Sequence, residues 1–403
     1  MRRVVITGAG CITAIGNSVE AFSANLFAGV TGIREIENAP PGSLLFSKVA
    51  RVVDFSPADW LMQSQVQLAE RSSQFAIASA RQAISSSALT NHYAGEDTAV
   101  IFGCSAGGRT AEEPETARLY TQGTRVHPLT VPRAMASAGT SLVCMEHAIT
   151  GPAYTVSTAC ASSAHAIGQA FHMVRSGMVK AALAGGHEAP LTYGFMKSWD
   201  SLRAVSPTYC RPFAANRDGT TLGEGATIFS LEAMDAALDR GAPILAEIVG
   251  FGMSSDATHI TQPNPSGSAA AMDRALRDAS IKPHEVGYVN AHGTGTEIND
   301  RLEAQAIHSV FGEAATTLPI SSTKGLHGHA MGASGAIELL AAVLALQKGL
   351  LPCAGGISNP DETLGLRCLL RENKVSTTSY ALSNSFAFGG LNAVIALKRY
   401  LSS

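Results

Sequence analysis

The chain has 403 residues, of which 46% are hydrophobic and 15% are charged, and its formal net charge is −3. This length exceeds one average domain, so two domains or two fused similar halves are expected. The small net charge gives no signal for nucleic acid or membrane binding, and the longest apolar stretch, residues 339–346, is far too short to span a membrane.

The first half of the chain alternates expected strands and helices. A strand at residues 3–7 runs into Gly8-Ala9-Gly10, which imitates a dinucleotide fingerprint, but Thr13 stands where the third glycine would be. A nicotinamide site is therefore not expected. The later elements of this half are helices at residues 18–27 and 66–87, a strand at 98–102, a polar excursion to about Pro132, a helix at 133–149 and a strand at 181–184.

Cys160 is the candidate nucleophile. It follows a short apolar strand and opens a helix that ends before Gly177. A thiol in the first turn of a helix lies beside unpaired backbone N–H groups and the positive end of the helix dipole, which favour the thiolate. Taken alone, the feature also fits a small buried apolar residue.

The second half repeats this order. A helix at residues 331–348, stopped by Gly349, corresponds to the Cys160 helix. A mainly parallel, helix-covered sheet is expected in each half, with the matching loops of both halves around one shared site. The expected strands of this half, at 244–253, 286–290, 319–323 and 380–384, match in turn the opening strand, residues 98–102, the strand before Cys160 and residues 181–184.

Three further motifs follow expected strands and would meet Cys160 in this arrangement. They are NAHGTGT with His292, STKGLHGH with Lys324 and His329, and the glycine-rich turn SNSFAFGG at residues 383–390. A nucleophile, imidazoles, a cation and backbone amides are the components needed for acyl transfer.

Each of these features also has a plainer explanation. A histidine at a strand end is commonly structural, and Lys324 could be a solvated charge. His327 and His329 could form half of a metal site, although neither a carboxylate nor a second cysteine stands at ligand spacing, so no metal is expected.

The cysteines and the chain start suggest a compartment. Seven cysteines are scattered along the chain without a C-x-x-C pair, as expected for free thiols in a reducing environment. Only Met1-Arg2-Arg3 precedes the first apolar run, too little for a signal peptide. We therefore expect a cytoplasmic protein with neither a nucleic acid nor a membrane partner.

Together these motifs resemble those of the elongating β-ketoacyl-acyl-carrier-protein synthases, the condensing enzymes of fatty acid and type II polyketide synthesis. The resemblance covers essentially the whole chain. It implies a thiolase-like α/β fold of two similar halves in five layers, α-β-α-β-α, divided into residues 1–240 with the nucleophile and 241–403 with two catalytic histidines. The motifs that carry the resemblance are VVITGAG, TACASS, RPF at 211–213, RDGTTLGEGA at 217–226, NAHGTGT, STKGLHGH and SNSFAFGG.

The resemblance implies a decarboxylative condensation of a Cys160-bound acyl chain with malonyl-acyl-carrier protein, in fatty acid synthesis or in polyketide-like synthesis, polyenes included. His292 and His329 would bind the malonyl thioester and stabilise its enolate, donating hydrogen bonds from neutral imidazoles. Lys324 would pair with Glu303. Neither a metal nor an organic cofactor is needed.

The family also implies roles around the cysteine. Backbone N–H groups of Cys160 and Phe388 would form the oxyanion hole, with Phe388 and Gly389 in a gate that moves when the acyl chain loads. Ala106 and Phe195 would line the acyl pocket, where Ala106 replaces a bulkier aliphatic residue and implies a deeper or wider pocket.

Other positions depart from the family pattern. Ala387 replaces a gate glycine, which implies a stiffer loop, and His327 replaces a common threonine. Residues 52–70 contain no Lys or Arg, although the family commonly meets its acidic carrier protein with basic residues there. Either Arg203 and Arg211 dock the carrier, or a partner subunit does.

The missing basic cluster motivates one hypothesis on assembly. The chain would form either a homodimer or a heterodimer with a paralogue that resembles a chain-length factor. Two other functions remain open: a non-catalytic partner subunit, disfavoured because Cys160 is retained, and a thiolase-fold acyltransferase or thioesterase, disfavoured because His292 and His329 are both retained.

Overall fold

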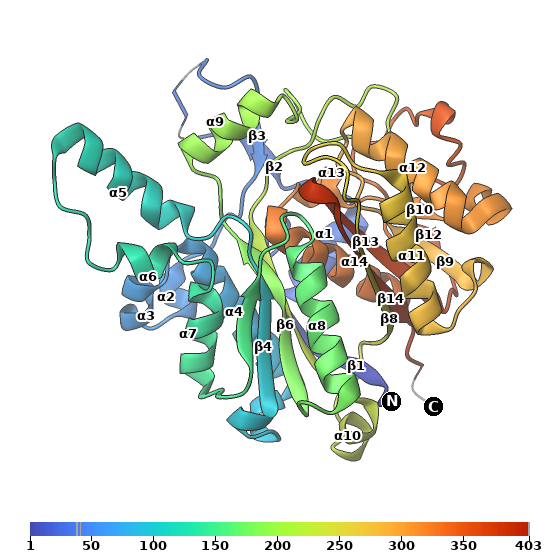
Figure 1. Ribbon diagram of the computed structural model, residues 1–403, viewed down its shortest axis with the longest axis horizontal. Coiled ribbons are helices and arrows are strands. Elements are labelled where there is room, and N and C mark those ends of the chain that lie inside the picture. The colour runs from blue at the N-terminus through green and yellow to red at the C-terminus, as the bar shows by residue number, and fades with distance from the viewer. Residues whose placement is uncertain (38, 41, 402–403) are drawn as a thin grey trace.

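The computed structural model describes residues 1–37, 39–40 and 42–401. Ten strands form one hydrogen-bonded sheet, around which the helices are arranged (Figure 1). The order across the sheet is β10 (Ile320–Ser321), β9 (Val286–Asn290), β13 (Tyr380–Ala387), β14 (Leu391–Lys398), β8 (Ala246–Ser255), β1 (Val4–Thr13), β7 (Gly225–Ala233), β6 (Ala181–Glu188), β4 (Thr98–Gly103) and β5 (Ala153–Val156).

The two halves of the sheet have the same strand order. From the outer edge to the centre, one half reads β5-β4-β6-β7-β1 and the other β10-β9-β13-β14-β8. The halves join where Val4, Val5 and Ile6 of β1 pair with Ile248, Glu247 and Ala246 of β8 in antiparallel register. The repeat expected from the sequence is thus present in the topology.

The expectation of a mainly parallel sheet in each half is wrong. In each half, the two outer pairs are parallel and the two inner pairs are antiparallel. Strands β13 and β14 are separated only by the turn at Phe388–Gly390, and a connection this short can join only antiparallel neighbours.

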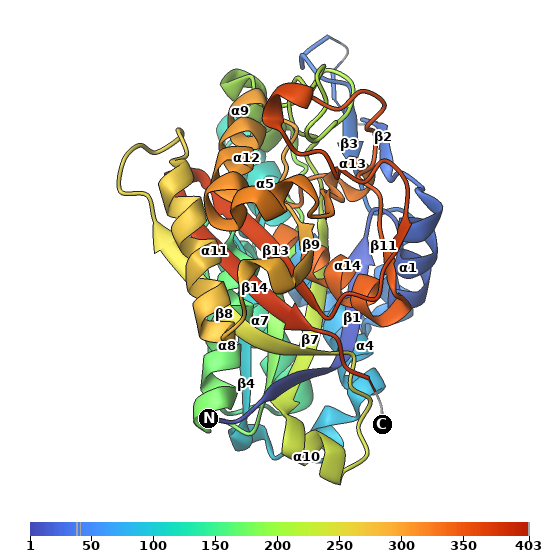
Figure 2. The same ribbon diagram turned by 90° about the vertical axis from the view of Figure 1, so that its right-hand side faces the viewer.

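Each half of the sheet forms one β layer, and helices complete the five layers α-β-α-β-α (Figures 1 and 2). The outer layer of the first half is formed by α4 (Arg71–Ser87) and α7 (Ala138–His147), and that of the second by α11 (Pro265–Ala279) and α12 (Glu297–Phe311). The middle layer consists of α8 (Ser162–Ser176) and α14 (Ser334–Lys348), which contact each other and strands of both halves.

The composition of α14 follows from this central position. A helix buried on all sides is apolar all round, and the span Met331–Lys348 is long and apolar enough, by length and composition, to cross a membrane, yet 89% of it is buried inside the fold. It is a core helix. At its start, an added Cβ on Gly335 would lie 2.7 Å from Ser385 Oγ and 3.0 Å from the Ala164 Cβ of α8, so the glycine favours this close approach.

Two expected helices differ in the structure. The helix expected at residues 66–87 is split into α3 (Gln63–Leu68) and α4, because buried Glu70 caps α4 by accepting the backbone N–H groups of Ser72 and Ser73. The helix expected at 133–149 begins only at Ala138.

The polar excursion before Pro132 is largely helical. It contains α5 (Arg109–Gln122) and leads to α6 (Thr130–Ala134), which together project from the body of the molecule in Figure 1. Nearly all of α5 is exposed, so its sequence carries no apolar periodicity from which a helix could be predicted.

Further elements support the loops around these layers. They include α1 (Val19–Ala28), β2 (Ile33–Glu35), β3 (Lys48–Ala50), α2 (Pro57–Trp60), α9 (Tyr193–Leu202), α10 (Met234–Asp239), α13 (Lys324–His327), β11 (Leu350–Leu351) and β12 (Lys374–Val375).

Candidate active site

Cys160, His292 and His329 meet in one cavity of about 500 Å³, the active-site cavity. One potential ligand atom from each of the three residues lies within 4.8 Å of the others. The residues follow β5, β9 and β10, so the matching strand ends of the two halves converge as the sequence predicted.

Cys160 lies just before α8 rather than in its first turn, since the helix begins at Ser162. Ala159 is left-handed (φ 48°), a conformation unusual for a residue with a side chain. The Cys160 Sγ lies 3.1 Å from His329 Nε2. Burial raises the pKa of Cys160 to about 12, although Lys324 and the backbone N–H groups of Phe388 and Cys160 lower it. The expected thiolate is therefore not the resting form, and the thiol needs a base.

His329 is placed to be that base. Its Nε2 faces Cys160, and its Nδ1 lies 2.7 Å from Ser334 Oγ. A hydroxyl can donate or accept, so Ser334 permits either tautomer of His329. Burial, followed by the charge of Lys324, holds the pKa of His329 well below its ordinary value. The imidazole is neutral at pH 7.

His292 is held in one tautomer. Its Nδ1 lies 3.3 Å from the Lys324 ammonium, which can only donate, so Nδ1 accepts and Nε2 carries the proton. Burial and the Lys324 charge hold the pKa of His292 well below its ordinary value. His292 is thus a fixed neutral donor into the cavity, in contrast to His329.

The expected pairing of Lys324 with Glu303 is wrong. Lys324 is fully buried and forms its ion pair with Glu338 of α14, while it also donates to the His292 carbonyl. Burial raises the pKa of Glu338 and Lys324 opposes this. We infer an ion pair, because a buried ammonium without a counter-charge is costly.

Glu303 has a different role. Its carboxylate accepts the backbone N–H groups of His292 at 2.8 Å and Gly293 at 2.7 Å, and Nδ2 of Asn384 at 3.2 Å. Burial raises the pKa of Glu303 to about 7. It fixes the loop that carries His292 without facing Lys324.

The gate residues lie over the cysteine. The backbone N–H of Phe388 is directed at Cys160, and the Phe388 side chain is 38% exposed. Gly389 is left-handed (φ 81°) and its N–H donates to the Ile260 carbonyl at 2.7 Å. Ala387 is extended (φ −123°), a conformation open to any residue, so glycine is not required there in this state.

The cluster of Cys160, His292 and His329 has the composition of a three-ligand zinc site. The proton on His292 Nε2, fixed by Lys324, occupies the atom that would bind the metal. His327 does not extend the cluster, because its Nδ1 lies 2.9 Å from the Gly328 carbonyl and its Nε2 lies 2.8 Å from Thr323 Oγ1.

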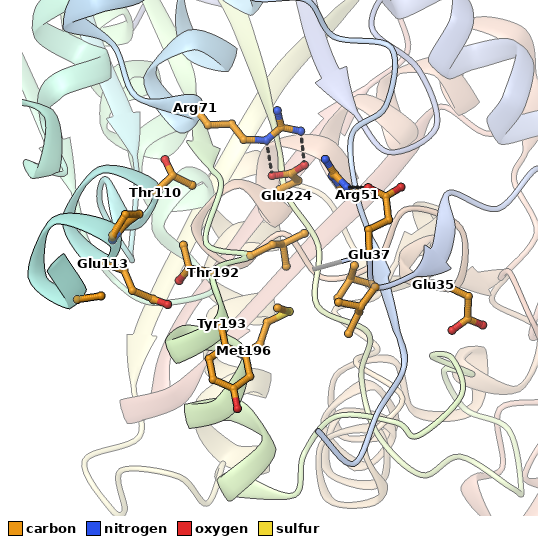
Figure 3. Close-up of a pocket in the computed structure, with 15 residues that line it drawn as sticks. Glu35, Glu37, Arg51, Arg71, Thr110, Glu113, Thr192, Tyr193, Met196 and Glu224 are labelled. Atoms are coloured by element: carbon orange, nitrogen blue, oxygen red, sulfur yellow. Dashed lines mark hydrogen bonds and ion pairs between the residues drawn. The ribbon is translucent and has the colours of Figure 1, made fainter. Parts of the chain in front are cut away.

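The predicted acyl-pocket residues lie outside the lining of the active-site cavity. The Ala106 N–H donates to Glu188 at 3.0 Å, and Phe195 packs on Trp199 with ring centroids 6.3 Å apart. A second cavity of about 500 Å³, between β2, α5 and α9 (Figure 3), does not contain them in its lining either. Their role in an acyl pocket stays a prediction.

The two predicted docking arginines differ. Arg203 is exposed and lines the active-site cavity. Arg211 is only 8% exposed, pairs with Asp218 at 2.8 Å and stacks on Tyr209. The docking role for Arg211 stays a prediction, although its guanidinium is already engaged by Asp218.

Three residues that line the site or contact its side chains were missed from the sequence: Glu338, Ser334 and Trp199. Glu338 is the one acidic residue in the apolar run of α14, and a lone charge in a buried helix signals a buried partner. Ser334 and Trp199 carried no comparable signal.

Known proteins resemble the chain along its whole length. Two family models match, the β-ketoacyl synthase N-terminal domain over residues 1–237 and the β-ketoacyl synthase C-terminal domain over residues 245–357. A Rhizobium sp. protein named nodulation protein E is 37% identical over 406 residues, 99% of each chain. A 3-oxoacyl-[acyl-carrier-protein] synthase 2 of Synechocystis sp. is 36% identical over 409 residues, 99% of this chain and 98% of that one. The solved ishigamide ketosynthase/chain length factor superposes with a TM-score of 0.95 at 33% identity, covering 99% and 100% of the two chains.

Proposed function

The chain belongs to the β-ketoacyl synthase family and is a 3-oxoacyl-[acyl-carrier-protein] synthase; from this premise we propose that Cys160 carries the acyl chain and that His292 and His329 drive its elongation. The reaction is the decarboxylative condensation of an acyl chain with malonyl-acyl-carrier protein in fatty acid or polyketide synthesis.

Acyl loading begins at the neutral thiol. The Cys160 sulfur attacks the thioester carbonyl of the acyl-carrier protein while His329 Nε2, 3.1 Å away, takes the thiol proton. The new C–S bond forms, the carrier thiolate leaves, and His329 returns the proton to it. Ser334 supports this exchange because its hydroxyl fits both tautomers of His329.

Decarboxylation follows when the malonyl thioester enters. The bond to the carboxylate breaks, CO2 leaves, and the electron pair becomes an enolate whose negative oxygen needs donors. His292, fixed as a neutral Nε2–H donor by Lys324, supplies one of them, and His329 supplies the other. Glu338 and Glu303 act as positioning residues through Lys324 and the His292 backbone.

The enolate carbon then attacks the Cys160 thioester. The negative oxygen of the tetrahedral intermediate is held by the backbone N–H groups of Cys160 and Phe388. Its collapse releases the β-ketoacyl-carrier product and the Cys160 thiolate, which takes up one proton from solvent to restore the thiol. Gly389 permits the turn that presents Phe388.

One observation carries this proposal: a thiol and two imidazoles, all buried, converge within 4.8 Å, and both imidazoles are neutral. Simple acyl transfer needs a single base, whereas the second, fixed donor fits decarboxylation. A non-catalytic partner subunit would need no nucleophile at all.

Intact-mass spectrometry tests the proposal. The protein is incubated with acyl-carrier proteins of graded chain length and then with malonyl-carrier protein. Acylation at Cys160, absent in Cys160→Ala, followed by a β-ketoacyl product is expected. Acylation without elongation would instead favour an acyltransferase, and the absence of acylation would favour a non-catalytic subunit.

The same premise extends to partners and location. We propose an acyl-carrier protein docked at the cavity mouth near exposed Arg203. We also propose assembly as a homodimer or with a chain-length-factor-like paralogue, supported by the ketosynthase/chain length factor neighbour, in the cytoplasm. The division into residues 1–240 and 241–403 is supported by the repeated strand order and the limits of the two family models.

A further inference from the structure

Trp199 of α9 connects two residues that the sequence analysis treated separately. Its ring stacks on Phe388 of the gate, with centroids 5.7 Å apart and an interplanar angle of 16°. It also contacts Phe195, at 6.3 Å and 45°. Trp199 therefore links a residue of the predicted acyl pocket to the gate.

Of the two stacked residues, Phe388 is less restrained than Trp199. Phe388 lies in a turn beside left-handed Gly389, and its side chain is 38% exposed. Its backbone N–H is directed at Cys160. A movement of the Phe388 ring that opens access to Cys160 must therefore break the ring stack.

Trp199 stands on a firmly anchored helix. Near its start, the Gly194 N–H donates to Glu113 of α5 at 2.7 Å. Near its end, buried Asp200 accepts the Leu45 N–H at 2.8 Å and pairs with Lys197 at 2.7 Å. These contacts hold the helix that carries the Trp199 ring.

Helix α9 also separates the two cavities. Tyr193 and Met196 line the second cavity, where Figure 3 shows them below Thr192, whereas Trp199 and Leu202 line the active-site cavity. Substitutions on the two sides of this one helix can thus separate an effect on the gate from an effect on the helix.

We propose that Trp199 is a positioning residue that latches Phe388 over the free Cys160 and releases it when an acyl chain is loaded past Phe195. The latch rests on the proposed function, since it assigns to Trp199 the timing of acyl loading. A stacked pair of this kind shifts a two-state equilibrium by about 2- to 13-fold.

Trp199 can report on its own contact, because the chain has only two tryptophans, Trp60 and Trp199. In a Trp60→Phe background, Trp199 emission is recorded before and after acylation, with acylation of Cys160 followed by mass spectrometry in the same samples. The emission is expected to change in proportion to acylation and to stay constant in the added Cys160→Ala variant.

A second measurement needs no substrate. Alkylation of the Cys160 peptide by iodoacetamide is expected to be about 2- to 13-fold faster in Trp199→Ala, near the wild-type rate in Trp199→Phe, and unchanged in the matched control Tyr193→Ala, which lies on the same helix. Thermal unfolding of each variant identifies any that fail to fold.

The outcomes separate the latch from the proposed function. Constant Trp199 emission despite complete acylation, or wild-type alkylation in folded Trp199→Ala, would overturn the latch. Failure of Cys160 to acylate would refute the proposed function, while the alkylation rates would still decide whether Trp199 restrains Phe388.

Discussion

Helices α8 and α14 begin at matching places in the two halves, yet the residues around their starts carry different chemistry. A left-handed residue stands three positions before each helix, Ala159 (φ 48°) before Ser162 and Met331 (φ 45°) before Ser334. In this alignment, Cys160 corresponds to Gly332.

The glycine leaves no room for a nucleophile. An added Cβ on Gly332 would lie 2.6 Å from the Glu188 carboxylate, whereas the Cys160 side chain faces the cavity. The start of α14 instead holds a base through Ser334 and, one turn into the helix, an ion pair through Glu338. One copy of the repeated unit supplies the atom that forms bonds, and the other supplies the groups that move protons and stabilise charge.

The largest expected effect separates bond formation, assigned to the first half, from proton transfer and charge stabilisation, assigned to the second. Cys160→Ala should abolish acylation but leave malonyl decarboxylation, whereas His292→Ala should retain acylation and lower condensation by on the order of 10²–10⁴-fold. Acyl-enzyme mass and CO2 release measure the two steps. Loss of acylation in His292→Ala would break the division between the halves.

The next effect concerns the ion pair on the α14 side. Lys324→Met leaves Glu338 as an uncompensated buried carboxylate and removes the donor to His292, so we expect a loss of about 3–5 kcal/mol in the free energy of unfolding and on the order of 10²–10³-fold in condensation. Urea unfolding and a condensation assay measure them.

A double variant identifies the true partner of Lys324. Lys324→Met combined with Glu338→Leu should recover most of the lost stability without recovering activity. Recovery with Glu303→Gln in place of Glu338→Leu would contradict the pairing described above.

Ser162 and Ser334, which stand at matching positions, also distinguish the starts of the two helices. Ser162 Oγ accepts the Thr158 N–H at 2.9 Å and closes its own turn, whereas Ser334 Oγ holds His329. Ser334→Ala should slow acylation about 5-fold, equivalent to one hydrogen bond of about 1 kcal/mol, with little change in stability. Ser162→Ala should lower the free energy of unfolding by about 1 kcal/mol. Identical profiles for the two variants would mean that the serines share one structural role.

A further effect, of similar size, is a pH dependence on the imidazole-rich side. Burial lowers the pKa of His327 to about 3, against about 6.5 in the unfolded chain. The unfolded state therefore binds the proton first, and stability is lost as the pH falls below about 6.5. Between pH 7.5 and 5.5, His327→Asn should lose about 1.4 kcal/mol less than the wild type in urea unfolding. Parallel losses would show that His327 is solvated.

The positions of most strands were readable because they rest on local patterns, but β7 and β14 were not expected. Residues 286–290, expected as a strand from the apolar run and the motif after it, form β9 with the same limits. The position of His292 and His329 at strand ends followed directly. These features depend on neighbours in sequence, which the sequence displays.

The errors concern features that only the packed structure decides. Glu303 lies on α12 of an outer layer and Glu338 on central α14, and the choice of partner for Lys324 depends on which carboxylate the packing turns toward it. The burial of Arg211 against Asp218 likewise leaves no trace in the local sequence. The Cys160 thiol was misjudged because burial outweighs the neighbouring N–H groups and Lys324.

The pairing of β1 with β8 also has a consequence for how the protein folds during its synthesis. β1 precedes the other nine strands of the sheet in the sequence, and all ten of its residues are buried in the finished fold. Its two neighbours, β7 and β8, begin only at Gly225 and Ala246. During translation this apolar strand therefore has no strand partner until β7 has been synthesised. Such long-range pairing slows folding and exposes the nascent chain to aggregation.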